Sequence, residues 1–229
     1  MPVHKMFRFA ALFIIILAGA QLPASAQIAT PGNPLPAWKE GYLDLHHINT
    51  GWGDAAFYIF PDGTTMLFDA GEMNPTGSRA FTPRNAAMRP NYSKRAYEWI
   101  VEYIKKVSPL KDKAVIDYAA ISHFHDDHFG SWYPGAKLSA TGKYNLTGIT
   151  AVGELIPIRC LLDRDFPDYD YPYSIKRNKD RFGGEINFWK TMQNYFDFIA
   201  AQQQKGMKAE RFKAGSRSQV HMKYHARQY

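Results

Sequence analysis

The sequence predicts an α/β fold, and three observations along its 229 residues support this expectation. Hydrophobic residues make up 45% of the chain and charged residues 21%, the balance of a folded soluble domain and not of a disordered one. Short runs with strand-like alternation are interspersed with segments of helical periodicity. The run at 115–121 is mostly apolar and partly β-branched, as expected of a strand buried in a sheet.

Turn and cap signals define the expected elements in the first half of the domain. Pro61-Asp62-Gly63 is a turn signal that joins two strand-like segments into a hairpin. Ser93 is placed to cap a helix whose apolar residues recur at i, i+3, i+4 and i+7, and Pro109 ends that helix. The predicted strands are 42–48, 55–60, 64–68 and 115–121, the predicted helix is 93–107, and residues 74–92 are expected to form a loop.

The second half of the chain is less regular. Residues 148–158 are largely apolar and are expected to hold a further strand, whereas residues 161–173 are rich in turn-forming Asp and Pro. Residues 185–204 form the clearest predicted helix, with Phe188, Met192, Tyr195, Phe196 and Ile199 largely on one face. Residues 220–229 begin like a strand.

The N-terminus has the pattern of a secretory signal peptide. Lys5 and Arg8 precede a short apolar run, and Ala24-Ser25-Ala26 has the small-x-small pattern of a cleavage site. The apolar run covers residues 9–20 and is shorter than the roughly 20 residues that span a bilayer. We therefore expect a periplasmic or secreted protein with no stable membrane span after cleavage; an uncleaved N-terminal anchor is the alternative. The expected organisation is a signal peptide at 1–26, a flexible lead at 27–40 and one domain at 41–229.

The single cysteine fits this compartment, because an exported protein with one thiol has no internal disulfide. Cys160 is expected to be a small buried apolar residue.

The most informative stretch is Ser122-His123-Phe124-His125-Asp126-Asp127-His128, which follows the predicted buried strand. Residues two apart in an extended segment point the same way, so His123 and His125 are placed to bind one metal ion from one side. Asp127 and His128 follow where the chain must turn, and they can therefore face a neighbouring ion. Imidazole and carboxylate groups suit zinc and, less selectively, iron or manganese.

Such a donor set predicts hydrolytic chemistry. A water held between two metal ions loses a proton near neutral pH and becomes a nucleophile, while the metals polarise the electrophile. Three histidines and an aspartate within six residues are rare by chance in a chain with 8 histidines. We predict that His123, His125, Asp127 and His128 are metal ligands and that Asp127 is also catalytic. Asp126, which lies outside the pattern, is expected to support the site or to face solvent.

The pattern His-x-His-x-Asp-His after a buried strand resembles the hallmark of the metallo-β-lactamase superfamily. Phe68-Asp69-Ala70-Gly71 is similar to the first motif of that superfamily, in which the aspartate orients the metal-binding loop and is not itself a ligand. Asn49-Thr50-Gly51-Trp52-Gly53-Asp54 resembles one branch, the hydrolase domain of the DNA-uptake competence channel and its soluble relatives, although Trp52 stands where glutamine is common. The resemblance covers about residues 42–131.

The resemblance implies an αβ/βα sandwich, of which this chain carries mainly the N-terminal half. It also implies two Zn²⁺ ions, with Mn²⁺ or Fe²⁺ as alternatives, and supporting roles beside the ligands for Asp69 and Asp54. On their residues alone, Asp54 could merely cap a turn. Gly51 and Gly53 could simply form a tight loop that needs positive φ.

The resemblance further implies a Gly-Asp and a His-His-Gly after His128, and neither occurs in the sequence. We therefore expect that the sequence is C-terminally truncated and that the chain as given binds metal weakly, if at all. A competing source of ligands is His221 with His225, whose i, i+4 spacing would place both on one face of a helix. His46 and His47, in the first strand, are not expected to be ligands.

The predicted function is that of a metal-dependent hydrolase that uses a metal-activated water on phosphodiester substrates, either small molecules, nucleotides or nucleic acid. The alternatives are a hydrolase of β-lactams or lactones and a non-catalytic binding module that retains the fold. A less favoured alternative is a soluble partner of a DNA-uptake machine. The net charge of +7 suits phosphate-bearing substrates but most of the basic residues are expected to be solvated surface.

Overall fold

Six strands form one mixed sheet whose spatial order follows the sequence, in a computed structural model that describes residues 30–78, 82–83, 85–178, 188–225 and 227–229. Strands β1 to β3 pair antiparallel, and β3 to β6 pair parallel. The strands are β1 (Asp44–His47), β2 (Ala56–Ile59), β3 (Thr65–Phe68), β4 (Ile116–Ile121), β5 (Ile158–Asp163) and β6 (Lys208–Arg211). The mixed sheet with its helices confirms the predicted α/β class.

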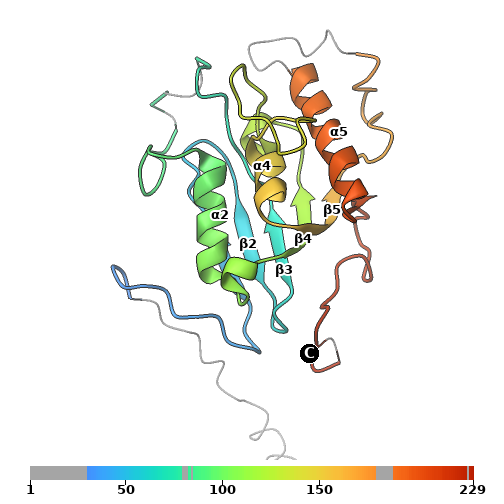
Figure 1. Cartoon of the computed structure of the whole chain (residues 1–229). Coiled ribbons are helices and arrows are strands. Elements are labelled where there is room, and N and C mark those ends of the chain that lie inside the picture. Colours follow the sequence, from blue (N-terminus) through green and yellow to red (C-terminus); the bar gives the residue numbers. More distant parts are fainter. Residues whose placement is uncertain (1–29, 79–81, 84, 179–187, 226) are drawn as a thin grey trace, which may run out of the picture. The chain divides into compact units, whose positions relative to one another are not determined.

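Three helices lie on one face of this sheet (Figure 1). They are α2 (Ala96–Val107), α4 (Gly148–Leu155) and α5 (Phe188–Gln204), and α4 packs against both of the others. Two shorter elements complete the described structure, the 3-10 helix η1 (Lys111–Lys113) and the single turn α3 (Asp126–Phe129). The last of these carries part of the histidine motif.

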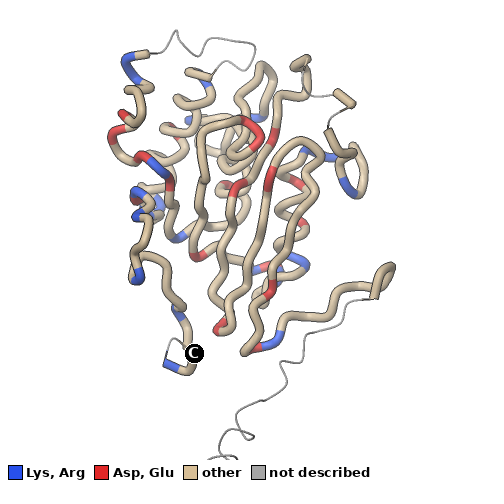
Figure 2. Tube along the Cα trace, turned by 180° about the vertical axis from the view of Figure 1, so that it is seen from behind, with Lys and Arg blue, Asp and Glu red and all other residues tan. Residues whose placement is uncertain are grey.

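Alternating side chains of the strands build two apolar clusters, one on each face of the sheet. Toward the helices, Phe57, Leu67 and Ile121 join a large core with Ile100 and Phe198. On the other face, which Figure 2 shows from behind, a smaller cluster contains Met66, Tyr118, Ala120, Cys160 and Leu162. Because β4 contributes to both clusters, all six of its residues are buried, as predicted for the run at 115–121.

Cys160 is a buried free thiol, as expected from the sequence. Burial, more than its charged neighbours, raises the pKa of the Cys160 thiol to about 11. The side chain therefore packs as a small apolar group and is protonated at neutral pH.

The compact unit of the chain covers Ala37–Tyr229, and residues 30–36 belong to a separate unit. It therefore begins at Ala37, within the lead predicted at 27–40, and the Trp38 side chain packs against the main core. The predicted signal peptide at 1–26 lies outside the described residues. No helix within the described ranges has the length and hydrophobicity that a membrane crossing requires.

Two helices differ from their predicted form. Ser93 does not cap α2, which begins at Ala96 after Arg95, because the Glu98 carboxylate accepts a hydrogen bond from the Arg95 backbone N–H at 2.7 Å. The strand predicted within 148–158 is wrong, since residues 148–155 form α4. This helix is buried from Gly148 to Gly153, and a short, mostly apolar run of this length cannot be told from a buried strand by its hydrophobic pattern alone.

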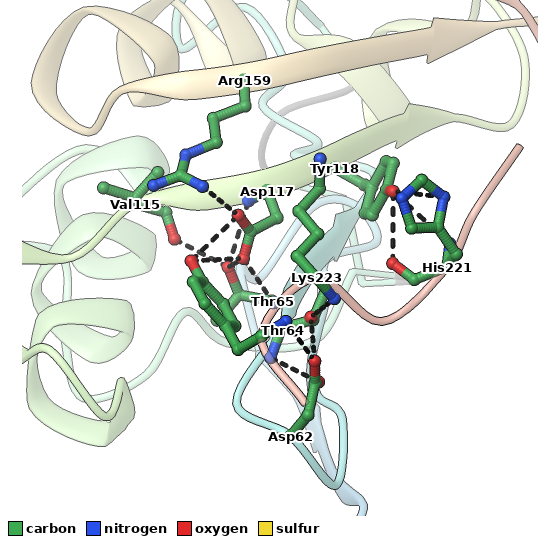
Figure 3. A network of polar contacts seen from close by, with 10 residues as sticks. Asp62, Thr64, Thr65, Val115, Asp117, Tyr118, Arg159, His221 and Lys223 are labelled. Atoms are coloured by element: carbon green, nitrogen blue, oxygen red, sulfur yellow. Dashed lines mark hydrogen bonds and ion pairs between the residues drawn. The ribbon is translucent and has the colours of Figure 1, made fainter. Parts of the chain in front are cut away.

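The C-terminal segment at 212–225 is not the strand that its first residues suggest. At 221–225 its backbone donates to side-chain oxygens and not to a strand: the amides of Tyr224 and His225 donate to the Asp62 carboxylate at 2.8 and 3.3 Å. The Lys223 amide donates to the Thr64 hydroxyl at 2.7 Å (Figure 3). The hydroxyl of Tyr224 donates to buried Asp117, which also forms an ion pair with Arg159.

Asp62 is the residue on which this attachment depends most, and its pKa predicts an acid-sensitive contact. Burial alone would raise the pKa of Asp62, but hydrogen bonds from Tyr224, Thr64 and His225 outweigh burial and hold the pKa below its usual value. A lowered pKa in the folded state means that the stabilisation is fully present above the ordinary pKa of about 3.9 and is lost as the pH falls through the folded-state pKa.

We therefore expect Asp62→Asn to weaken the attachment of the segment at neutral pH, because the amide group presents an N–H donor to two backbone N–H groups. Amide hydrogen exchange should show lower protection at Lys223–His225 in the variant at pH 7, and in the wild type only below about pH 4. Equal protection in the two proteins at pH 7 would show that Asp62 does not hold the segment.

Candidate metal centre

The histidine motif lies where the parallel strands β3 and β4 end side by side. Phe68 is in register with Ala120, and the Asp69 amide donates to the Ala120 carbonyl at 2.9 Å. The chain leaves β3 through Asp69 and β4 through Ser122, so the two loops that carry the predicted site begin at the same edge of the sheet.

Asp69 connects these two loops through its carboxylate. It is 3% exposed, and it accepts hydrogen bonds from the Ser122 amide at 2.8 Å and from the Ser122 hydroxyl at 2.7 Å. The second carboxylate oxygen also lies 2.8 Å from His128 Nδ1. A carboxylate next to an imidazole nitrogen favours the proton on that nitrogen, so His128 donates from Nδ1 and its Nε2 carries a free lone pair.

The three histidines of the motif lie in contact with one another. Nε2 of His123 and Nδ1 of His125 share a hydrogen bond at 3.0 Å, and the rings of His123 and His128 are 3.9 Å apart between centroids. Because the Ser122 hydroxyl donates to Asp69, its oxygen is left to accept from His123 Nδ1, 3.0 Å away. With Nδ1 as the donor, a neutral His123 ring keeps its lone pair on Nε2, the atom paired with His125.

Electrostatics favour the neutral form of His123. Burial, and then the neighbouring rings of His128 and His125, lower the pKa of His123 below its usual value. Neutral imidazole is the form that binds metal ions, so the His123 ring is in the ligand form at pH 7.

Asp127 lies on α3 with its backbone held and its carboxylate incompletely paired. Its carbonyl accepts a hydrogen bond from the Asp54 amide at 2.8 Å. Within the described residues, its Oδ1 is buried and has no hydrogen-bond partner, and lies 3.9 Å from His128 Nε2. A buried carboxylate oxygen without a hydrogen-bond partner is costly, so this atom is a candidate donor to a ligand at the site.

Two glycines make this backbone arrangement possible. A Cβ atom on Gly71 or on Gly53 would overlap the carbonyl oxygen of Asp127, so only glycine fits at either position. Gly51 has φ +80°, as expected for a tight loop, whereas Gly53 is required by close approach and not by φ.

Asp54 and Asp126 differ in exposure at the site. The Asp54 carboxylate is largely exposed, and its Oδ2 lies 3.8 Å from His128 Nε2. Asp126 is buried and its carbonyl accepts from the Glu72 amide at 3.2 Å, so it does not face solvent.

The residue types of the motif are ones that bind divalent metal ions. Two nitrogens bound to one tetrahedral zinc lie about 3.3 Å apart, close to the 3.0 Å between the paired nitrogens of His123 and His125. The free Nε2 of His128 faces the carboxylates of Asp54 and Asp127. As the side chains stand, no three His, Cys, Asp or Glu residues of the described chain are arranged to hold a metal ion.

Of the other histidines that the structure describes, three have partners outside the motif. His46 Nδ1 is hydrogen-bonded to the Tyr103 hydroxyl at 3.1 Å, and His47 is exposed at the edge of the sheet. His221 bonds to Tyr118 and His225 to Glu40, and the segment that carries them is not helical.

Two supporting residues had no assigned role in the sequence prediction. Ser122 contacts Asp69, His123 and His128. Its position between the buried strand and the first histidine is the sequence feature that could have indicated this supporting role. Glu72 follows the Asp69–Gly71 motif and is fully buried. Nothing in the local sequence indicates that burial, because its partner Arg95 lies on a different element.

Comparison with protein-family models, with curated proteins and with solved structures finds no match to this chain.

Proposed function

We propose that this protein is a metal-dependent hydrolase of the metallo-β-lactamase type, exported to the periplasm or beyond. The observation that carries the proposal is the orientation of His128. Its Nδ1 is held by Asp69, and its Nε2 faces Asp54 and Asp127 beside the His123–His125 pair. A carboxylate that fixes one nitrogen of an imidazole while the other stays free is the usual support of a metal ligand.

The fold agrees with the first half of an αβ/βα sandwich. Helices cover one face of the mixed sheet, and an apolar cluster with Met66 and Leu162 lies on the other. The motif residues lie at the ends of β3 and β4, where loops of an α/β protein carry function.

In this proposal His123, His125, Asp127 and His128 hold the metal, and Asp69 and Asp54 support them. Zinc is the expected ion, with manganese or iron as alternatives. A bound divalent ion would lower the pKa of its water and polarise the substrate. Asp69 keeps His128 in the binding tautomer, and the unpaired Oδ1 of Asp127 supplies a further anionic donor.

A cavity of about 610 Å³ beside the motif offers room for a substrate. His128, Ser122 and Asp69 line one side, and Asp54 with the end of β1 lines the other. We propose phosphodiesters, of small molecules, nucleotides or nucleic acid, as its substrates; β-lactams or lactones are the alternative, because the same site can attack carbon or phosphorus.

The test uses the natural full-length protein with zinc or manganese, on bis(p-nitrophenyl) phosphate and on nitrocefin. We expect hydrolysis of the phosphodiester that is lost with EDTA and in His125→Ala, and retained in the control His225→Ala. Faster hydrolysis of nitrocefin would favour the carbonyl alternative. Hydrolysis of neither substrate would contradict the enzymatic proposal.

One observation favours a non-catalytic binding module as the second candidate. The described side chains do not already form a three-residue metal group, although His123, His125 and His128 are in contact. Such a module would keep its biological role when His125 is replaced by alanine, whereas an enzyme would lose it.

A further inference from the structure

A second cavity adjoins the one beside the histidine motif. Its volume is about 890 Å³, and it lies between the end of β1 and the outer side of α2. His47, Ile48 and Asn49 line both cavities, so the two share one wall. The two cavities therefore adjoin at residues 47–49.

The second cavity carries cations without partners. Arg89, Lys105 and Lys106 line it, and none of them forms an ion pair within the described residues. Two carboxylates also line it, and one of these, Glu102, is neutralised by an ion pair with Lys94. Asp112 is the remaining acid, so the cavity keeps an excess of positive charge.

Its aromatic walls are fixed before any ligand binds. Trp99 donates from its indole N–H to the Asn91 carbonyl at 3.0 Å, and the Lys94 ammonium lies 4.5 Å from its ring centroid. The hydroxyl of Tyr103 is hydrogen-bonded to His46. A cavity with held walls loses little conformational entropy on binding, as expected of a binding site.

We propose that this cavity, defined by Arg89, Trp99, Lys105 and Lys106, is a second subsite that binds a phosphate group. The subsite binds a second phosphate group of the substrate, one that is distinct from the group attacked at the histidine motif. That this phosphate belongs to a substrate rests on the proposed function, whereas phosphate binding at the subsite does not. The two lysines also lie in the last turn of α2, where positive charge suits the helix dipole, so the test must separate binding from helix stability.

The experiment is a calorimetric titration of the protein with inorganic tripolyphosphate in the presence of EDTA, at low and at high salt concentration. We expect Lys105→Gln/Lys106→Gln to raise the Kd at least tenfold and Lys105→Arg/Lys106→Arg to bind like the wild type. The matched control is Lys208→Gln/Lys213→Gln, which removes the same charge from exposed positions outside the cavity. Binding in the wild type should weaken with salt.

Equal affinity of the wild type and Lys105→Gln/Lys106→Gln, or an equal loss in the control, would overturn the subsite. A second arm measures KM in the full-length protein for bis(p-nitrophenyl) phosphate and for a 5′-phosphorylated thymidine dinucleotide. The glutamine variant should raise KM only for the dinucleotide, and an equal change for both substrates would contradict the proposal. If neither is hydrolysed, the proposed function fails while the tripolyphosphate result still decides the subsite.

Discussion

Replacing Glu72 by alanine is expected to lower the free energy of unfolding by about 3–5 kcal/mol, the usual cost of breaking a buried ion pair from one side. Glu72 is fully buried and forms an ion pair with Arg95, the residue that precedes α2. Its carboxylate also accepts the Gly148 amide at 2.9 Å, at the start of α4. The substitution would leave the Gly148 amide without its acceptor and Arg95 without its counter-charge, and so weaken the contacts of two helices with the loop after β3.

Glu72→Gln should lower the free energy of unfolding less than Glu72→Ala does. The amide oxygen of glutamine can still accept one of the hydrogen bonds that the carboxylate accepts, whereas alanine can accept none. Burial raises the pKa of Glu72 against the opposing charge of Arg95, so loss of the negative charge also removes part of the cost of burying it. The matched control is Glu102→Ala, which breaks an exposed ion pair with Lys94 and should cost at most about 1 kcal/mol. Chemical denaturation measures all three; equal stability of Glu72→Ala and Glu102→Ala would contradict the role of Glu72.

Asp69→Asn is expected to weaken zinc binding about 10- to 100-fold while the fold is retained. The new amide can still accept from the Ser122 backbone N–H, but its N–H₂ group would face the Ser122 hydroxyl or His128 Nδ1. His128 would then lose the acceptor that keeps its Nε2 free.

Competition with a chromophoric chelator measures the zinc affinity of this variant, and circular dichroism checks the fold. Asp168→Asn is the control, since that carboxylate forms only an exposed ion pair with Arg211. If Asp69→Asn and Asp168→Asn bind zinc equally well, Asp69 does not support a metal ligand.

Local signals predicted the parts of the fold that depend on local chemistry. The turn at Pro61–Gly63 does join β2 to β3, and the run at 115–121 is the buried β4. The helix at 185–204 appears as α5 from Phe188, with Met192, Tyr195 and Ile199 buried, while residues 185–187 lie outside the described chain. Where a short run is mostly apolar and buried, as in α4, the sequence did not distinguish helix from strand.

Long-range contacts account for most of what the sequence did not show. The C-terminal segment lies where Asp62 and Thr64 accept its amides, and these residues are far from it in sequence. At the site, the motifs predicted that Asp69 and the histidines would lie together, and the structure places them in contact. The close packing of Gly53 and Gly71 on Asp127 brings three separate loops together, so no local sequence pattern could show it.

The central claim, that the histidine motif binds a divalent metal, is tested most directly by zinc titration of the natural full-length protein, followed through histidine ¹⁵N NMR signals at pH 7. We predict that zinc, even if it binds weakly, shifts the ring nitrogens of His123, His125 and His128 together. His46, His47, His221 and His225 should not respond. Shifts confined to His221 and His225, or no shift of the motif up to millimolar zinc, would contradict the claim.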